Sequence, residues 1–580
     1  NFHPHDAPSI TLAAQRQESF AATQQRIEEV LLELSSTLKS SSLPWHSPRY
    51  LGHMCADLLL PAHLAYMATM LYNPNNVAWE ASPVTTGLEL EVGLELAKML
   101  GFDPNQAFGH VTSGGTVANI EAVWVARNLK SIPLAIKQVK PELVAGLSEW
   151  ELLNLSPSRI LELISQVEAE IDAVKKHSVR GEGMNGFKLG KIFVPATKHY
   201  SWHKMVDVLG IGRNNLVVVN VTPRYSLDID DLRAKLAATL AAGEPILAVV
   251  GVVGTTEEGA VDPIDKIVAL RREFEQKGSS FFIHLDAAYG GYARTIFLDE
   301  ALDFMPYPVL KQRLAADQII ETSLDYPPRH VYDAFQAIDQ VDSVTVDPHK
   351  WGYVPYQAGA VVFRDRRVRN IISYFAPYVF EEGNESQNPL LLGSYILEGS
   401  KSGAAAAAVW ASHQVVPLHI GGYGQIIGQG IESALILHQM LLEQGSFTVG
   451  GKVYRALPLV QPETNIVMYA FNEEGNCSLE AMNRLNRAIK ANLYYEPGRL
   501  TLQYDFMVSS TSLSARDYGE TPLVYLRQLG LPDTEWGPDK EVFMLRSTIM
   551  TPYFLHGFSH SHYLTELFTC FRQILEKVGP

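Results

Sequence analysis

Hydrophobic residues near the start of the chain recur with the spacing of a helix. Over 19–40 they lie three or four positions apart, as on one helix face: Ile27, Val30, Leu31, Leu34 and Leu38. Similar spacing over 58–71 and 88–99 predicts two further helices. We therefore predict a helical N-terminal segment over residues 1–100.

Beyond Gly101 the pattern changes to short apolar runs separated by helical stretches. Strand-like runs are found at 191–195, 216–219, 246–254, 281–286, 343–347 and 358–363. Helical spacing is found at 115–129, 201–209, 229–241 and 263–276. Strands that alternate with helices are typical of an α/β fold with a mostly parallel sheet. We predict such a domain over 101–429, followed by a smaller α+β domain over 430–580.

Size, charge and cysteine content narrow the class of protein. A chain of 580 residues is too long for a single hydrophobic core. Its net charge of −16 disfavours nucleic acid or an anionic membrane as a partner, because both attract clustered positive charge. Cys55, Cys477 and Cys570 are too few for a disulfide framework or a zinc site, so we expect no metal and a cytoplasmic location. No apolar run reaches the roughly 20 residues that span a bilayer.

The segment Asp347-Pro348-His349-Lys350 directly follows a strand-like run. A lysine at a strand end can present its amine to a cleft above the sheet. To bond to an aldehyde, that amine must be unprotonated part of the time, which a dry site with cationic neighbours favours. The alternative is an exposed surface lysine, the commoner fate of a lone lysine.

A second segment, His284-Leu285-Asp286-Ala287-Ala288, places a carboxylate and small residues after another apolar run. The ring of pyridoxal 5′-phosphate (PLP) needs such a carboxylate to keep its pyridine nitrogen protonated. Ala288 would lie under the ring, where a bulkier side chain would collide. The alternative is an aspartate that caps the following turn.

Two segments rich in glycine and hydroxyl groups suit a phosphate. Gly115 and Thr116 open the helix predicted from residue 115, and free backbone N–H groups at a helix N-terminus attract anions. Thr255 and Thr256 end the run at 246–254 and would complete the phosphate or ring contacts. Residues of these types are also ordinary helix caps.

His199 follows the run at 191–195, and its flat ring can stack on the cofactor face opposite Ala288. Many histidines are half-buried without such a role. However, all of these residues follow a predicted strand or begin a helix. Ligands of open α/β sheets bind where the carboxyl ends of the strands meet. Together, the segments therefore predict one PLP site.

This ordered set resembles the group II PLP-dependent decarboxylases, and most of all the bacterial tyrosine decarboxylases. The resemblance spans about 44–554 and is carried by segments 42–46, 142–146, 199–202, 251–254, 347–356 and 396–401. It implies a type I, aspartate aminotransferase-like PLP fold. It also implies a homodimer with the active site at the interface.

By position, the resemblance implies that PLP is held by Gly115, Thr116, His199, Thr255 or Thr256, Asp286, Ala288, His349 and Lys350. Lys350 would carry the covalent bond, Asp286 would contact the ring nitrogen, and His199 would stack on the ring. Tyr378 matches the loop tyrosine that protonates Cα after CO₂ leaves. Related aldehyde synthases have phenylalanine there, so tyrosine favours simple decarboxylation.

The resemblance also implies a set of substrate contacts: His53, Ser82, Tyr356, Arg546 and Ser547. The favoured activity is decarboxylation of L-tyrosine or another aromatic amino acid. One alternative is a glutamate or aspartate decarboxylase, which needs a cation for the distal carboxylate. Another is a PLP-dependent lyase of the same fold.

Overall fold

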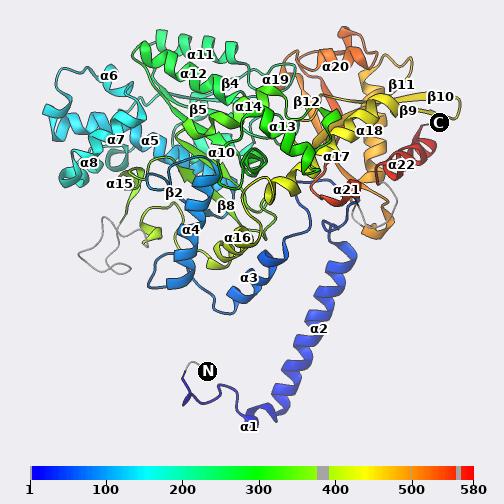
Figure 1. The fold of residues 1–580 in the computed structure, drawn as a ribbon, viewed down its shortest axis with the longest axis horizontal. Coiled ribbons are helices and arrows are strands. Elements are labelled where there is room, and N and C mark those ends of the chain that lie inside the picture. The colour runs from blue at the N-terminus through cyan, green and yellow to red at the C-terminus, as the bar shows by residue number, and fades with distance from the viewer. Residues whose placement is uncertain (1–2, 375–390, 497, 557–562, 580) are drawn as a thin grey trace.

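The computed structural model describes residues 3–374, 391–496, 498–556 and 563–579. Within these residues the chain forms two β-sheets, surrounded by helices, and a long helical arm at the N-terminus (Figure 1). No described helix is long and apolar enough to cross a membrane.

The larger sheet of the described chain has seven strands in the order β2-β8-β7-β6-β5-β3-β4. Their bounds are β2 Phe108–Thr112, β3 Lys191–Pro195, β4 Leu216–Val219, β5 Ile246–Val252, β6 Phe282–Asp286, β7 Ser343–Val346 and β8 Gly359–Phe363. Only β8 runs antiparallel to its neighbours, and all other pairs are parallel. The predicted mostly parallel sheet is therefore confirmed, and every strand-like run from 191 to 363 is a strand.

Alternation along the strands places helices on both faces of this sheet. On β8, Val361 and Phe363 pack into the same core as helix α5, whereas Ala360 and Val362 pack into the opposite core. The first face also carries α7 (Pro157–Ser165) and α10 (Ser201–Val208); the second carries α4 (Pro83–Met99), α12 (Ile264–Gln276) and α14 (Arg329–Gln336). Helix α5 spans Gly115–Val139, ten residues beyond the predicted end at 129.

The smaller described sheet has six strands in the order β1-β12-β13-β11-β10-β9. Their bounds are β1 Tyr50–Leu51, β9 Ser446–Val449, β10 Lys452–Pro458, β11 Ile466–Glu473, β12 Met507–Ser514 and β13 Glu541–Thr548. Helices α17 (Tyr423–Gln444), α18 (Leu479–Leu493) and α22 (Tyr563–Val578) accompany it. Strand β1 comes from the N-terminal segment and pairs in parallel with β12. This pairing ties the first part of the chain to the last.

The remaining described helices connect or flank these layers. They are α6 Glu149–Leu153, α8 Ile171–Lys176, α9 Val179–Glu182, α11 Ile229–Ala241, α13 Tyr307–Ala316, α15 Val368–Ile372, α16 Gly403–Val415, α19 Ala515–Tyr518, α20 Leu523–Gln528 and α21 Tyr553–His556. The domain boundaries at 100 and 429 stay a prediction.

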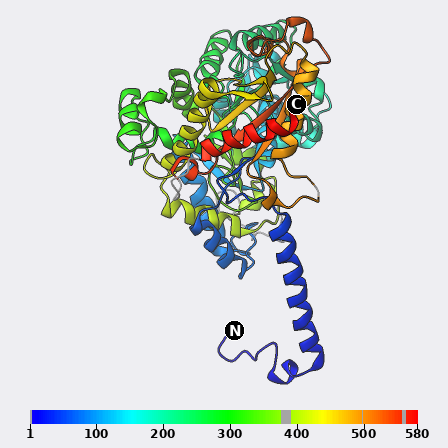
Figure 2. The ribbon, with the colours of Figure 1, turned by 90° about the vertical axis from the view of Figure 1, so that its right-hand side faces the viewer.

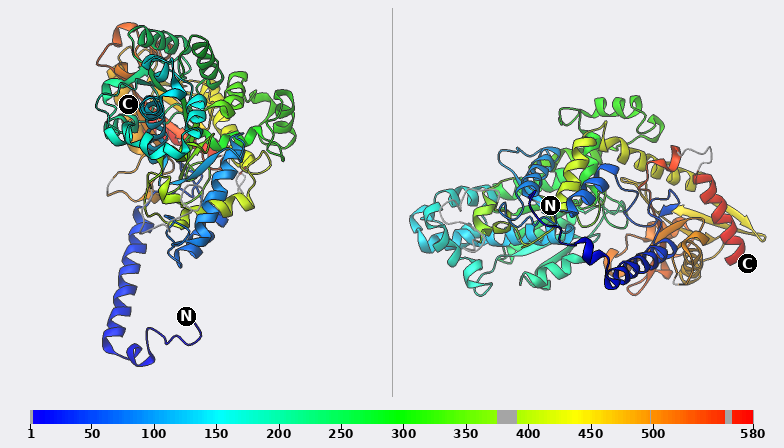
Figure 3. Two further views of the ribbon diagram at one scale, coloured as in Figure 1. Left: turned by 90° about the vertical axis from the view of Figure 1, so that its left-hand side faces the viewer. Right: turned by 90° about the horizontal axis from the view of Figure 1, so that it is seen from below.

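At the N-terminus, α1 (Leu12–Gln15) and α2 (Glu18–Ser41) have no buried residue. Helix α2 extends away from the body of the chain in Figure 2 and in the left view of Figure 3. Helix α3 (Leu60–Met70) lies closer in but also exposes several large apolar side chains. The helices predicted at 19–40 and 58–71 are therefore confirmed. Helix α2 has no buried residue, whereas α3 packs against α16 and leaves its outer side exposed.

Candidate active site

A cavity of about 290 Å³ lies at the carboxyl ends of the central strands. It is lined by Ser113, Gly114, Gly115, Thr116, Val117, Asn119, Thr197, His199, Val252, Gly254, Thr256, Asp286, Ala288, Tyr289, Asp347, His349 and Lys350. Most of these follow β2, β3, β5, β6 or β7. The topology therefore brings the five predicted cofactor segments to one place, where open α/β sheets bind ligands.

Asp286, the last residue of β6, is held by a hydrogen-bond chain at the floor of the cavity. Its Oδ2 accepts bonds from Asn119 Nδ2 at 2.9 Å and Trp202 Nε1 at 3.1 Å. Asn119 Oδ1 in turn lies 2.9 Å from His284 Nε2. Burial lowers the pKa of His284 to about 4, so its ring is neutral near pH 7 and can donate to Asn119. The carboxylate is thus fixed in position with one oxygen left for a ligand.

Lys350 extends into the same cavity from the turn after β7. Its Nζ lies 3.1 Å from Asp347 Oδ2. Asp347 is 2% exposed, and its other oxygen, Oδ1, has no partner among the described residues. His349 Nδ1 lies 2.6 Å from the Ala358 carbonyl oxygen, and burial lowers the pKa of its ring. An amine and an unpartnered polar atom therefore face one small space.

The N-terminus of α5 forms the anion-binding part of the cavity. Within the described chain, the N–H groups of Gly115 and Thr116 donate to no protein atom, as expected for the first turn of a helix. A Cβ on Gly115 would come 2.9 Å from the Ala288 Cβ and 2.8 Å from Asp347 Oδ2. Glycine is therefore required there by close approach of the neighbouring walls.

Thr255 and Thr256, which the sequence leaves as alternatives, have different surroundings. Thr255 is fully buried and its hydroxyl donates to Glu258 Oε2 at 2.9 Å. Thr256 lines the cavity. The geometry therefore leaves only Thr256 facing a ligand.

His199 and Ala288 both line the cavity, as the predicted ring stacking requires. His199 Nδ1 lies 2.7 Å from Ser201 Oγ, which sets the orientation of the ring. Burial lowers the pKa of His199, and the nearby Asp286 carboxylate acts in the opposite direction.

The predicted substrate residues are more scattered. His53 lies 2.7 Å from the Tyr50 hydroxyl, and Tyr356 lies 3.0 Å from Cys55 Sγ with its ring 4.3 Å from that of His349. Neither His53 nor Tyr356 lines the cavity itself; Tyr356 lies outside it, beside His349.

Arg546 and the two predicted serines have protein partners. Arg546 Nη1 contacts Glu257 Oε2 at 3.2 Å. Ser547, in β13 of the smaller sheet, is buried and lies 3.0 Å from the Tyr469 hydroxyl. Ser82 is buried beside Thr85, with which it forms a hydrogen bond. In the described chain neither serine reaches the cavity. Tyr378 lies outside the described residues.

Three further residues of the site had no assigned role in the sequence analysis. Asn119 and Trp202 hold Asp286, and Thr197 lines the cavity with a buried hydroxyl that has no partner among the described residues. Asn119 lies four positions after Gly115 and therefore on the same face of α5. This spacing could have identified it from the sequence. Trp202 and Thr197 flank His199 in the sequence, but only the fold shows that their side chains point towards Asp286 and the cavity.

These groups fit PLP. The cavity offers a lysine amine, a strand-end carboxylate, and two free N–H groups at a helix N-terminus. Its orphaned polar atoms, Thr197 Oγ1 and Asp347 Oδ1, are what a polar ligand would satisfy. Its volume is of the order that a small cofactor needs.

Comparison with known proteins identifies relatives along the whole chain. The family model "Pyridoxal-dependent decarboxylase conserved domain" matches residues 10–145, 160–298 and 327–460, and "Tyrosine decarboxylase, C-terminal" matches 433–575. The L-tyrosine decarboxylase of Levilactobacillus brevis is 45% identical over 579 residues, covering 100% of this chain and 91% of that protein. The L-tyrosine decarboxylase of Enterococcus faecalis is 44% identical over 580 residues, covering 100% and 92%.

A solved structure supports the fold. The crystal structure of Oryza sativa TDC with PLP and tryptamine superposes with a TM-score of 0.62 at 15% identity, covering 99% of this chain and 90% of that one. At that identity the likeness concerns the fold, which is the type I fold of PLP-dependent decarboxylases.

Proposed function

The chain belongs to the pyridoxal-dependent decarboxylase family, and from this premise we propose that it converts L-tyrosine to tyramine and CO₂. As a family member it is a PLP-dependent carboxy-lyase. The observation that carries the choice of substrate is the 44–45% identity to L-tyrosine decarboxylases over the whole chain. Substrate specificity is set by side chains from several segments, so full-length similarity supports it better than a shared cofactor motif does.

The residues proposed to hold PLP are those that line the cavity. Lys350 would form the covalent bond through Nζ, and Asp286 would hold a proton at the ring nitrogen. Gly115, Thr116 and Thr256 would contact the phosphate. When bound, PLP supplies a ring that takes up the electron pair of the broken Cα–carboxylate bond.

The protein's own contribution is to orient groups and exclude water. Asn119 and Trp202 fix the Asp286 carboxylate, so its charge is in place before the reaction begins. Asp347, 3.1 Å from Nζ, orients the Lys350 amine towards the cavity. His199 would restrict the ring from the face opposite Ala288. These contacts reduce the reorganisation needed in the transition state.

Tyr378 is proposed to return a proton to Cα, on the strength of the family resemblance. Tyr378→Phe should lower tyramine formation by about 10²–10⁴-fold, because general acid catalysis contributes that much. PLP affinity should stay as in the wild type. Tyramine formation and cofactor absorbance are measured on the same preparation, and unchanged tyramine output would exclude the role.

The surroundings of Arg546 favour an aromatic over an acidic substrate. A glutamate or aspartate side chain would need a free cation, but the Arg546 guanidinium is paired with Glu257 at 3.2 Å. The aromatic rings of Tyr356, Trp45 and Tyr50, by contrast, lie near one another on the outer side of His349. We propose that His53 and Tyr356 lie close to the substrate ring.

The experiment is a substrate panel. The purified holoprotein is mixed separately with L-tyrosine, L-phenylalanine, L-glutamate and L-aspartate, and the amine is identified by mass spectrometry. The proposal expects tyramine as the main product. A main product from glutamate or aspartate would contradict the choice of substrate, and no amine from any of them would contradict decarboxylation.

We also propose a homodimer in the cytoplasm. The exposed large apolar residues of α2 and α3 support the dimer: Ile27, Val30, Leu31, Leu34, Leu38, Leu60, Leu64, Met67 and Met70. An apolar helix face without a partner in its own chain is typical of an interface. Three unpaired cysteines fit a reducing compartment. Light scattering should give twice the chain mass, and a monomer at micromolar concentration would contradict the dimer.

A further inference from the structure

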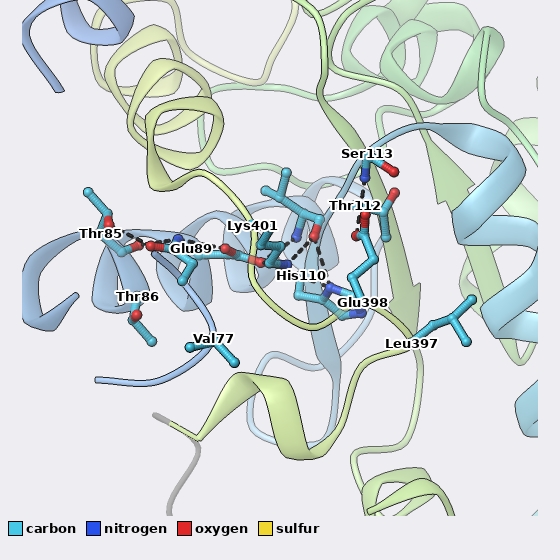
Figure 4. Close-up of polar contacts among 12 residues, drawn as sticks. Val77, Thr85, Thr86, Glu89, His110, Thr112, Ser113, Leu397, Glu398 and Lys401 are labelled. Atoms are coloured by element: carbon cyan, nitrogen blue, oxygen red, sulfur yellow. Dashed lines mark hydrogen bonds and ion pairs between the residues drawn. The ribbon is translucent and has the colours of Figure 1, made fainter. Parts of the chain in front are cut away.

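The segment 396–401 resembles the family's sequences but has no role in the function proposed above. In the structure it lies beside the end of β2, just before the predicted phosphate-binding turn (Figure 4). Glu398 Oε2 accepts a hydrogen bond from the Ser113 N–H at 3.2 Å. The Leu397 N–H donates to Glu121 Oε2 at 3.1 Å. The segment is therefore attached both to the turn itself and to α5, which the turn opens.

A buried ion pair strengthens this attachment. The Lys401 ammonium pairs with the Glu89 carboxylate, and the two side chains are 12% and 1% exposed. Lys401 Nζ also donates to the Val111 carbonyl oxygen at 2.5 Å, while Glu89 Oε1 accepts the Val111 N–H at 3.1 Å. The pair thus holds both backbone groups of one residue of β2, two positions before Ser113.

Neighbouring polar groups leave this pair little freedom. Asn76 Nδ2 donates to the second Glu89 oxygen at 2.7 Å, and the Asn76 N–H bonds to the Lys401 carbonyl oxygen at 2.9 Å. His110, fully buried, lies 2.8 Å from Glu121. A buried ion pair that is fully hydrogen-bonded fixes geometry, because breaking it leaves a charge without solvent.

We propose that Lys401 and Glu398 are positioning residues for the cofactor phosphate. They would hold the backbone from Val111 to Ser113 so that the free N–H groups of Gly115 and Thr116 converge on one point. Backbone N–H groups bind a phosphate only when their directions agree. Glu398 also engages the Ser113 N–H, which fixes the direction of the turn. This inference rests on the proposed function, since it concerns PLP bound at this cavity.

The test measures PLP affinity rather than turnover alone. Apoprotein is prepared from the full-length chain, and the dissociation constant for PLP is measured by quenching of tryptophan fluorescence. Lys401→Met should weaken PLP binding by about tenfold to 100-fold, the range for losing a charge-assisted hydrogen bond. Glu398→Gln should weaken it by about threefold to tenfold. With saturating PLP, kcat should stay within about threefold of the wild type, and Lys401→Arg should restore most of the affinity.

A matched control separates positioning from general stability. Arg271 and Asp342 form another buried pair in the same fold, at 2.6 Å, and Asp342 Oδ2 accepts the Ile283 N–H at 2.8 Å. This pair binds the backbone of β6 near its N-terminal end, whereas the cavity lies at the carboxyl ends of the strands. Arg271→Met should lower the melting temperature but leave PLP affinity unchanged.

The outcomes are distinct. Unchanged PLP affinity in Lys401→Met, or an equal loss in Arg271→Met, would overturn the inference. If Lys401→Met does not fold, Glu398→Gln against the same control decides the matter. If the wild type binds no PLP, the proposed function fails before the inference is tested.

Discussion

The floor of the cavity, which holds the cofactor carboxylate Asp286, differs in construction from the region outside the cavity, where the proposed substrate contacts His53 and Tyr356 lie. On the floor, Asp286, Asn119 and His284 are buried and joined by hydrogen bonds within one sheet and the helix that packs on it. Outside the cavity, His53 comes from the N-terminal segment and Tyr356 from the loop after β7, and both are exposed.

This difference separates two tasks. A floor fixed by buried hydrogen bonds suits chemistry that needs a constant geometry. Exposed side chains from separate segments can change with little cost to folding, which suits the choice of substrate. Changes to the floor should therefore affect kcat and cofactor binding, whereas changes outside it should affect KM.

The largest effect is expected from Lys350→Ala, which removes the proposed covalent bond to PLP. Turnover should fall by at least about 10³-fold, and the visible absorbance of bound cofactor should disappear. Absorbance spectra and tyramine assays are compared with Lys130→Ala, another lysine of the domain that lies outside the cavity. Retained absorbance and activity in Lys350→Ala would contradict the assignment of Lys350 as the residue that bonds to PLP.

A pH-dependent effect is expected at Glu258, which joins the loop after β5 to α19 beside the smaller sheet. It accepts hydrogen bonds from Thr255 at 2.9 Å and from Tyr518 at 2.6 Å. Burial raises its pKa from 4.5 to about 7, so the folded state keeps a proton that the unfolded state loses. The stability from this group is full below pH 4.5 and is lost as the pH rises to about 7.

Glu258→Gln, which cannot ionise, should therefore change the pH profile of stability. Urea unfolding at both ends of this range should show the wild type losing roughly 3 kcal/mol relative to the variant as the pH rises. Parallel profiles for the two proteins would contradict a buried, protonated carboxyl at this junction.

A smaller effect on chemistry is expected from Asn119→Ala. Asp286 would lose one of its two described donors, a loss of about 1.5–3 kcal/mol for a bond to a charged group. We expect kcat to fall by about tenfold to 100-fold with KM nearly constant. Steady-state kinetics at saturating PLP test this, and a change confined to KM would contradict the rigid floor.

The smallest effect is expected from Tyr356→Phe, which removes the hydrogen bond to Cys55 at 3.0 Å but keeps the ring beside His349. KM for L-tyrosine should rise by about twofold to tenfold, the range for one neutral hydrogen bond. Cys55→Ala is the matched variant, because it removes the same bond from the other side. A large fall in kcat in either variant would contradict the claim that residues outside the cavity affect mainly KM.

Much of the floor could be predicted from the sequence because its signals are local. Asp286 and Lys350 lie at or shortly after the end of a short apolar run, and Gly115 opens a run with helical spacing, so each signal is contained within a few residues. This is why Asp286, Lys350 and Gly115 were found as candidates. The same reasoning could not separate Thr255 from Thr256, because the sequence does not show which of two adjacent hydroxyl side chains points into the cavity. In the structure the Thr255 hydroxyl bonds to Glu258, and Thr256 lines the cavity.

Other features of the fold and the site could be placed only from the three-dimensional structure. Strand β1 is two residues long, too short to give a periodic signal, yet it joins the small sheet beside β12. Ser82 and Ser547 were substrate candidates by resemblance, but each bonds to a buried neighbour within its own chain.

The most direct test of the central claim is chemical trapping of the cofactor. The holoprotein is reduced with borohydride, digested, and mapped by mass spectrometry. The account predicts one phosphopyridoxyl group, on Lys350, and none when the protein is stripped of PLP beforehand. A modified lysine elsewhere, or no modified peptide from protein that still produces tyramine, would contradict it.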